Sequence, residues 1–356
     1  MEKLAAVLLL ILTGAQVYAS EFVLLGETHW STTEKIQKTR FGGLSGITFR
    51  NDKVFFMSDD RGQVNEPRFY EFQIKKDKNI WKLEDGKVHF VGLPPKSSRH
   101  EILDLEAMAS LPNGNFLISS EGDNNKKPRV PPRIFEVALD GHWIRDIPLP
   151  ARAIPEATGQ QRMGIGNNFG FEAMTVSDQA QNLYFISERP LIQDVDVKDT
   201  FNQYRFYQMK QQHDQYEMAS EKLVQGPSPS TEAGIALVQG FSEMVSVSEQ
   251  KFLLLDRTLK MNPSRLLTFE CRLVELDMTK ASDTSKIEKL TEAKNLKAAQ
   301  IVHVHLLKSG GSELGNCEGM ALGPGNDEYK QTLWIITDNN FSKSVDTVLY
   351  FYGVKN

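Results

Sequence analysis

The sequence has little cysteine, no excess of basic residues and no apolar run long enough to cross a membrane. Only Cys271 and Cys317 occur among its 356 residues, which excludes a disulfide-rich scaffold. The chain has 41 Lys and Arg against 46 Asp and Glu, a net charge of −5, and no Lys/Arg-rich stretch of the kind that nucleic-acid binding requires. We therefore expect neither a nucleic-acid partner nor a membrane span.

The N-terminal residues contain a charged residue, an apolar run and a cleavage site, in the order that is typical of a secretory signal peptide. Lys3 precedes an apolar run, Leu4 to Thr13, that is shorter than a bilayer span. Val17 and Ala19 then fit the −3 and −1 positions of a cleavage site. We expect cleavage after Ala19 and export of residues 20–356, as a monomer, to a periplasm or the medium. The alternative is a buried N-terminal strand or helix.

A three-part pattern occurs five times, with a period of roughly 60 to 75 residues that is typical of a repeat architecture. The first part holds a Glu or Ser before an apolar run, the second is an apolar run that ends in Asp or Glu, and the third opens with Arg in four of the five repeats. The first parts are residues 43–47, 104–108, 168–174, 240–244 and 316–320. The second parts are residues 55–59, 116–121, 183–189, 252–256 and 333–338, and the third parts are residues 68–70, 133–135, 205–207, 272–274 and 347–349.

Each repeat predicts a four-stranded antiparallel meander, the unit of a β-propeller blade. In the second repeat, an apolar strand, Leu105 to Leu111, turns at Pro112 to Gly114 and returns through Asn115 to Ser119. Two more strands follow, Arg133 to Leu139 and His142 to Leu149. We therefore expect an all-β protein, a single propeller domain over residues 20–356.

Five blades are visible, and the last is one strand short at the C-terminus. The segment Glu21 to Glu27 can supply that strand and close the ring. A sixth blade could lie in the connectors Ala151 to Asn168 or Gly226 to Gly240. The polar stretch Thr279 to Gln300 favours a short helix on the rim.

The blade pattern predicts one polar ring at one end of the central channel. Antiparallel pairing places the start of each first strand beside the end of each second strand, and the first strands line the channel. First strands contribute Glu106, Glu172 and Glu318. Second-strand ends contribute Asp59, Asp60, Glu121, Glu188, Asp256 and Asp338.

Clustered carboxylates repel one another unless a cation or arginines neutralise them. Oxygen ligands without a suitable Cys or His pair favour calcium first and magnesium second. The expected metal ligands are Asp59, Glu106, Glu172, Glu318 and Asp338. An arginine directly follows the acid at three positions and suits phosphate or carboxylate oxygens of a substrate; these are Arg61, Arg189 and Arg257. The expected catalytic residues are Asp59, Arg61, Glu172, Glu188 and Arg189.

Structural roles could explain the same pattern. A first-strand Glu could bind the Arg that opens a third strand and so tie the ring together; these arginines are Arg68, Arg133, Arg205 and Arg272. No serine lies in a Gly-x-Ser-x-Gly elbow, and the histidines are scattered. Cys271 opens a third strand and Cys317 a first strand, so we expect two free buried thiols.

The longer motifs resemble the phytase-like family that is described as having esterase-like activity. They are Phe41 to Gly46, Ser58 to Gly62, Asp104 to Met108, Asn168 to Met174 with Ser187 to Arg189, and Asn316 to Met320. The resemblance runs from about Phe41 to Tyr352. It implies a propeller fold, export and a phosphoester or carboxyl-ester hydrolase, but it assigns no catalytic residues.

The fourth repeat departs from the family pattern. Ser242 stands where other repeats have Glu, and Leu255 stands where others have Ser, which leaves this blade Glu243, Asp256 and Arg257 for the ring. The sequence as a whole predicts an exported hydrolase of small phosphate esters, phytate among them. The alternatives are a metal-dependent lactonase or carboxylesterase, and a non-catalytic binding module of the cell envelope.

Overall fold

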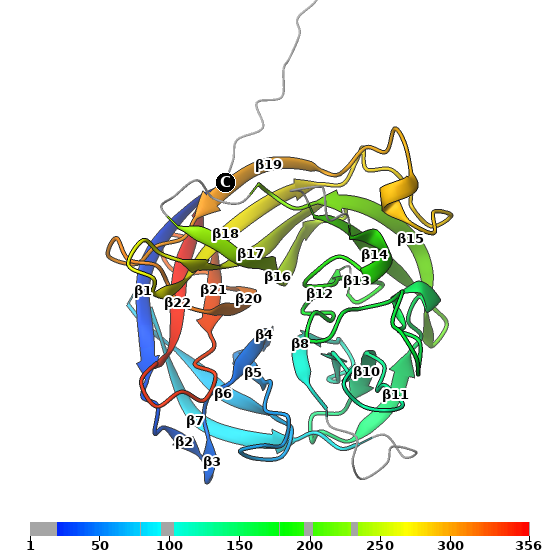
Figure 1. The fold of residues 1–356 in the computed structure, drawn as a ribbon. Coiled ribbons are helices and arrows are strands. Elements are labelled where there is room, and N and C mark those ends of the chain that lie inside the picture. Colours follow the sequence, from blue (N-terminus) through cyan, green and yellow to red (C-terminus); the bar gives the residue numbers. More distant parts are fainter. Residues whose placement is uncertain are drawn as a thin grey trace, which may run out of the picture.

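A computed structural model describes residues 20–355, apart from positions 79, 94–102, 178, 196–201 and 229–233. In this part of the chain, five four-stranded antiparallel sheets stand around a central axis, with a two-stranded hairpin beside them (Figure 1). The predicted all-β propeller with five blades is confirmed. None of the helices among the described residues is long and apolar enough to cross a membrane.

Each blade is a meander whose first strand lies nearest the axis (Figure 1). Blade 1 consists of β4 (Leu44–Arg50), β5 (Lys53–Ser58), β6 (Arg68–Asp77) and β7 (Ile80–Phe90). Blade 2 consists of β8 (Leu105–Ser110), β9 (Phe116–Ser120), β10 (Arg133–Val137) and β11 (Trp143–Ile147). Blade 3 consists of β12 (Ala173–Ser177), β13 (Asn182–Ile186), β14 (Gln203–Gln212) and β15 (Gln215–Gln225).

Blade 4 consists of β16 (Ile235–Ser248), β17 (Lys251–Met261), β18 (Leu267–Asp277) and β19 (Gln300–Leu306). Blade 5 consists of β20 (Cys317–Pro324), β21 (Gln331–Thr337), β22 (Thr347–Lys355) and β1 (Glu21–Trp30). The five innermost strands contact one another in ring order, β4 to β8, β12, β16, β20 and back to β4. Their N-terminal ends therefore surround a single channel mouth.

Apolar side chains fill the spaces between neighbouring blades. The rings of Phe55 in blade 1 and Phe116 in blade 2 lie 4.8 Å apart, centroid to centroid. Tyr184 in blade 3 and Phe252 in blade 4 are also 4.8 Å apart. Such aromatic pairs add to the burial of apolar surface that stabilises each interface. Because the apolar contacts lie between the sheets, the ends of the channel are left for polar groups.

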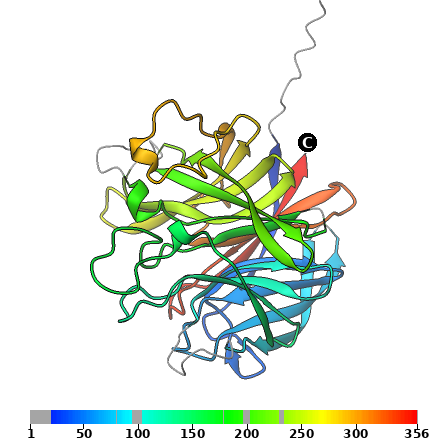
Figure 2. The same cartoon turned by 90° about the vertical axis from the view of Figure 1, so that its right-hand side faces the viewer.

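The N-terminal strand closes the ring as expected. β1 pairs antiparallel with β22 from Glu21 opposite Lys355 to Trp30 opposite Thr347. The side view shows these two strands, blue and red, lying together (Figure 2). The first strand of the described chain thereby covers what would be the exposed edge of the last blade.

The connectors hold no sixth four-stranded sheet among the described residues. Residues 151–168 contain one turn of 3₁₀ helix, η1 (Ala151–Ala153), and residues 235–240 extend the inner strand β16. The expected short rim helix is present only as a single 3₁₀ turn, η3 (Leu290–Glu292), in the stretch Thr279 to Gln300. The Asp194 carboxylate accepts a hydrogen bond from the Leu290 backbone N–H at 2.8 Å, which fixes this turn without a longer helix. The remaining elements are β2 (Lys35–Ile36), β3 (Thr39–Arg40) and η2 (Ile192–Asp194).

Cys271 and Cys317 form a disulfide, so the expectation of two free thiols is wrong. Their Cα atoms are 6.2 Å apart and the bond joins β18 of blade 4 to β20 of blade 5. Both side chains are buried in the same apolar cluster between these two blades. The repeat pattern places each cysteine on a strand. It does not show that both side chains face the interface between blades 4 and 5.

We expect the double substitution Cys271→Ala/Cys317→Ala to lower the free energy of unfolding by about 2 to 4 kcal/mol. The bond closes a loop of sequence separation 46, and its loss releases conformational entropy in the unfolded chain. Urea denaturation under non-reducing conditions measures the change. Reduced wild type should match the double variant, and an unchanged midpoint in that variant would contradict the assignment.

Candidate functional site

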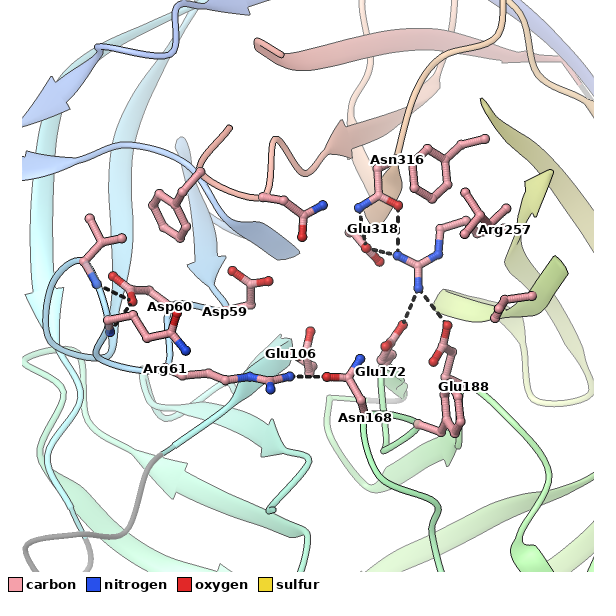
Figure 3. A pocket seen from close by; sticks show the side chains of 18 residues that line it. Asp59, Asp60, Arg61, Glu106, Asn168, Glu172, Glu188, Arg257, Asn316 and Glu318 are labelled. Atoms are coloured by element: carbon pink, nitrogen blue, oxygen red, sulfur yellow. Dashed lines mark hydrogen bonds and ion pairs between the residues drawn. The ribbon is translucent and has the colours of Figure 1, made fainter. Parts of the chain in front are cut away.

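A cavity of about 560 Å³ opens at one end of the central channel, and residues of all five blades line it (Figure 3). Its polar wall contains six carboxylates, two arginines and three asparagines: Asp59, Asp60, Glu106, Glu172, Glu188, Glu318, Arg61, Arg257, Asn168, Asn316 and Asn340. Apolar side chains and one glutamine complete the lining: Val64, Phe169, Val238, Leu259, Phe269, Phe341 and Gln63.

Strand pairing explains why these acids meet. In blade 3, Ala173 at the start of β12 pairs with Ile186 at the end of β13. Glu172 precedes the first strand and Glu188 follows the second, so both carboxylates lie at the same end of the blade. The same pairing in blade 1 places Asp59, just after β5, at the channel mouth.

A β-bulge lies at the motif residue of the inner strand in four blades. The register shifts between Leu44 and Gly46, Leu105 and Met108, Phe241 and Glu243, and Cys317 and Gly319. A bulge leaves a residue unpaired and re-aims its side chain. The residues at these shifts include Ser45, Glu106, Ser242 and Glu318.

The two serines among them are structural. Ser45 Oγ donates to the backbone oxygens of Leu105 and Glu106 in blade 2. Ser242 Oγ donates to the Cys317 oxygen in blade 5 at 3.0 Å. Serine at the bulge thus ties neighbouring inner strands together, whereas the glutamates at the equivalent places face the cavity.

Arg257 joins acids from two blades (Figure 3). Its Nη2 lies 2.7 Å from Glu188 Oε1 and 3.7 Å from Glu172 Oε2, and its Nη1 contacts the Glu318 carboxylate. Nη1 also donates to Asn316 Oδ1 at 3.0 Å. Burial alone would lower the pKa of Arg257, but the charges of Glu172 and Glu188 raise it above its usual value. This guanidinium therefore stays charged.

Arg61 binds a second group of acids, and Figure 3 shows its contact with the Asn168 side chain. Its Nη2 lies 2.6 Å from Asp104 Oδ2 and 3.9 Å from Glu121 Oε2, and it also contacts the Asn168 side chain. Asp104 and Glu121 are buried directly behind the lining. The two arginines thus approach the cavity from different blades.

Asp104, Glu106 and Glu121 form a buried acidic cluster with one oxygen of each within 4.8 Å of the others. Asp104 Oδ1 and Glu121 Oε2 make no hydrogen bond. Burial raises the pKa of Glu106 and of Glu121 well above the usual value, and the charge of Asp104 raises both further. This cluster could hold a metal ion through oxygen atoms alone.

The other predicted metal ligands surround this cluster. Asp59, Glu172 and Glu318 line the cavity, and Glu172 Oε2 is buried without a hydrogen bond. Asp338 lies behind the lining, where it accepts a hydrogen bond from Asn340 N at 2.7 Å. Burial raises the pKa of Asp338 to about 6. Burial also raises the pKa of Asp59 well above its usual range, and the charge of Asp338 adds to this effect.

Three of the arginines that open third strands, Arg68, Arg205 and Arg272, do not bind first-strand glutamates, so that structural prediction is wrong for these three. They bind acids at second-strand ends or in the following loops, and Arg205 also binds Glu221 on the fourth strand β15 at 2.5 Å. The pairs are Arg68–Asp60 at 2.7 Å, Arg205–Asp194 at 2.6 Å and Arg272–Asp256 at 2.7 Å. The first-strand glutamates therefore make no ion pair with these arginines. Asp60 and Asp256 instead stabilise their own blades through these ion pairs.

Five predicted positions lie outside the lining: Glu121, Arg189, Glu243, Asp256 and Asp338. The Arg189 guanidinium packs over the ring of Phe169, a lining residue, with 5.2 Å between Cζ and the ring centroid. Glu243 accepts hydrogen bonds from Met174 N and Met244 N and lies deeper in the channel. Of the three groups expected from blade 4, Glu243, Asp256 and Arg257, only Arg257 reaches the cavity.

Sequence reasoning missed Asp104, the asparagines and the apolar wall. Asp104 could have been found, because it precedes Glu106 by two positions, a spacing that places strand residues on one face. Asn168 and Asn316 open the first-strand motifs of blades 3 and 5 and could have been found in the same way.

The similarity of this chain to solved structures is distant. No curated protein matches the sequence. Among solved structures, a protein from Parabacteroides distasonis named as a candidate glycoside hydrolase is 10% identical, with a TM-score of 0.47 and coverage of 97% of this chain and 95% of that one. A DUF4623 family protein from Bacteroides eggerthii is 12% identical, with a TM-score of 0.37 and coverage of 96% and 78%. The polysaccharide lyase Uly1 is 8% identical, with a TM-score of 0.36 and coverage of 93% and 99%.

One family model matches residues 39–341, most of the chain, and its description is "Phytase-like: Esterase-like activity of phytase". The match spans the cavity motifs of all five blades, from Asp59 to Asp338. The protein therefore belongs to the phytase-like family with esterase-like activity.

Proposed function

We propose that the protein hydrolyses phosphate esters of small molecules at the channel mouth, with a calcium ion held by the acidic ring. The observation that supports this is the charge of the cavity: six carboxylates line it, and after the pairing of Asp60 with Arg68 five of them remain against the two arginines of the lining. Such an excess of buried negative charge is unfavourable without a bound cation or protons. A cation would balance the acids and attract an anionic ester.

The donor set fits a hard cation. All the groups that converge at Asp104, Glu106 and Glu121 are carboxylate oxygens, the ligands that calcium prefers, followed by magnesium. Two of these oxygens and Glu172 Oε2 are buried without a hydrogen-bond partner. A bound calcium ion would polarise the phosphoryl group and lower the pKa of water.

The chain's own side chains would orient the ester and move protons. Arg257 and Arg61 present planar guanidinium groups that suit phosphoryl oxygens. Glu188 holds Arg257 at 2.7 Å and so positions it. Asp59 and Glu172 have raised pKa values because they are buried, so we assign them the proton transfers to and from water and the leaving group.

The family description favours a second candidate, hydrolysis of a carboxyl ester or lactone by the same residues. The two arginines suit a carboxylate or an ester oxygen as well as a phosphate. Substrate choice in one assay separates these two activities, and a lack of turnover of every ester would favour the non-catalytic binding module.

We also propose export as a monomer, with a signal peptide cleaved after Ala19. Residues 1–19 lie outside the described part of the chain. The Cys271–Cys317 disulfide supports export, because such bonds form and persist in the periplasm or outside the cell. N-terminal sequencing of protein recovered from its native host should start at Ser20, and a start at Met1 would contradict this proposal.

Arg257→Ala should lower kcat/KM for p-nitrophenyl phosphate by roughly 100-fold or more, because the transition state loses a charged donor. Arg257→Lys keeps the charge and should lose less. The matched control is Arg145→Ala, which removes an ion pair with Glu136 on the outer part of blade 2 and should leave turnover unchanged.

The same assay includes p-nitrophenyl acetate and phytate, each with added calcium and with a chelator. Calcium-dependent turnover of phosphate esters supports the proposal, and calcium-dependent turnover of the acetate alone favours the carboxyl-ester candidate. No calcium-dependent turnover of any substrate would refute both.

Calcium should stabilise the protein more at high pH. Raised pKa values mean that Asp59, Glu106 and Asp338 keep protons in the folded state at a pH where the unfolded chain has lost them. Without calcium, stability should therefore fall as pH rises from about 4 through about 6 and above. The gain in Tm on adding calcium should grow between about pH 5 and about pH 8.

Differential scanning fluorimetry with calcium or a chelator measures this gain. In the double variant Glu106→Gln/Glu121→Gln the gain should be much smaller at every pH. A gain that does not change with pH, or one that the double variant retains in full, would show that calcium does not replace protons in this cluster.

A further inference from the structure

Blade 4 carries an apolar row next to the arginine of the cavity. Val238 pairs with Leu259 across β16 and β17, and Leu259 pairs with Phe269 across β17 and β18. All three side chains line the cavity. Arg257 lies two residues before Leu259 on β17 and therefore on the same face, about 7 Å away along the strand.

The row continues past the mouth of the cavity. In the next row on this face, Met261 pairs with Ile235 on one side and Leu267 on the other. Ile235 is 67% exposed, Leu267 is 61% exposed and Leu266 in the adjoining turn is 63% exposed. These are the three most exposed large hydrophobic side chains among the described residues. Single exposed hydrophobic residues are ordinary, but a cluster that borders a site is typical of a binding surface.

Beyond Arg257, in the segment that carries the apolar rows, the opposite face of the strands is polar. Lys260 and Glu270 point there and form a buried ion pair at 2.5 Å, with Glu313 3.7 Å from the lysine. In this segment the apolar rows are therefore confined to the cavity side of the sheet. We define the apolar strip as Val238, Leu259, Phe269, Ile235, Met261 and Leu267.

We propose that the apolar strip selects esters with one anionic group and one alkyl or aryl group. This inference rests on the proposed function and narrows its substrate class. Arg257 would hold the oxygens of the ester, and the apolar group would lie along the strip toward the exposed tip of blade 4. The excess of carboxylates in the lining opposes a substrate with many phosphates, so phytate should be a poor substrate.

The strip also accounts for the length of these strands. β16, β17 and β18 have 14, 11 and 11 residues, whereas β12 and β13 of blade 3 have five each. The extra residues of blade 4 extend past Arg257 and carry the strip. A blade that only completed the ring would not need them.

Binding of non-hydrolysable phosphonates tests the proposal without requiring turnover. Isothermal titration of the calcium-loaded full chain with methyl-, butyl-, hexyl- and phenylphosphonate measures how affinity depends on the apolar group. We expect affinity to rise about twofold or more with each methylene that the strip buries. Leu259→Ala and Phe269→Ala should flatten this dependence, so that they weaken hexyl- and phenylphosphonate binding much more than methylphosphonate binding.

Val238→Ala is a second, milder variant in case either substitution impairs folding, and Leu306→Ala, an exposed leucine on the outer strand β19, is the matched control. Equal affinity for all four phosphonates, or a chain-length dependence that every strip variant retains, would overturn the inference while leaving the proposed function intact. If no phosphonate binds and no ester is turned over, the proposed function fails and the substrate class fails with it.

Discussion

The salt bridges of Arg257 with carboxylates of blades 3 and 5 are the interaction on which the candidate site depends. A five-bladed ring brings the ends of five inner strands to one mouth, and the repeated motif places acids at several of those ends. Burial makes this charge unfavourable. Arg257 balances part of it, through contacts with Glu172, Glu188 and Glu318, and Arg61 balances another part through Asp104. The acids that remain unpaired, together with the buried group Asp104, Glu106 and Glu121, could hold a cation.

Blade architecture and ring closure could be predicted from the sequence because both depend on local patterns. Apolar runs, turn residues and the spacing of the repeats define a strand meander, and a missing strand at one terminus implies that the other terminus supplies it. The structure has β1 paired with β22 along its whole length. The composition of Thr279 to Gln300 favours a longer helix than the structure has. Hydrogen bonds to Asp194 and Glu221 hold this segment mostly as turns.

Side-chain partners were harder to predict than strand positions. The acid that meets a third-strand arginine is set by the loop before it, so Arg68 binds Asp60 rather than a first-strand glutamate. Bulges in the inner strands decide which motif residue turns toward the channel, and a bulge has no clear signal in the sequence. The pairing of Cys271 with Cys317 depends in the same way on two strands of different blades. The apolar wall was missed because Val238 lies in what looked like a connector.

The calcium content of the purified protein after dialysis tests the central claim most directly. Elemental analysis should find about one calcium ion per chain in the wild type, as expected for a site built from several carboxylates. The double variant Glu106→Gln/Glu121→Gln should hold none above the buffer level. Wild type without calcium, or a double variant that keeps as much as the wild type, would contradict the claim that these buried acids bind the ion.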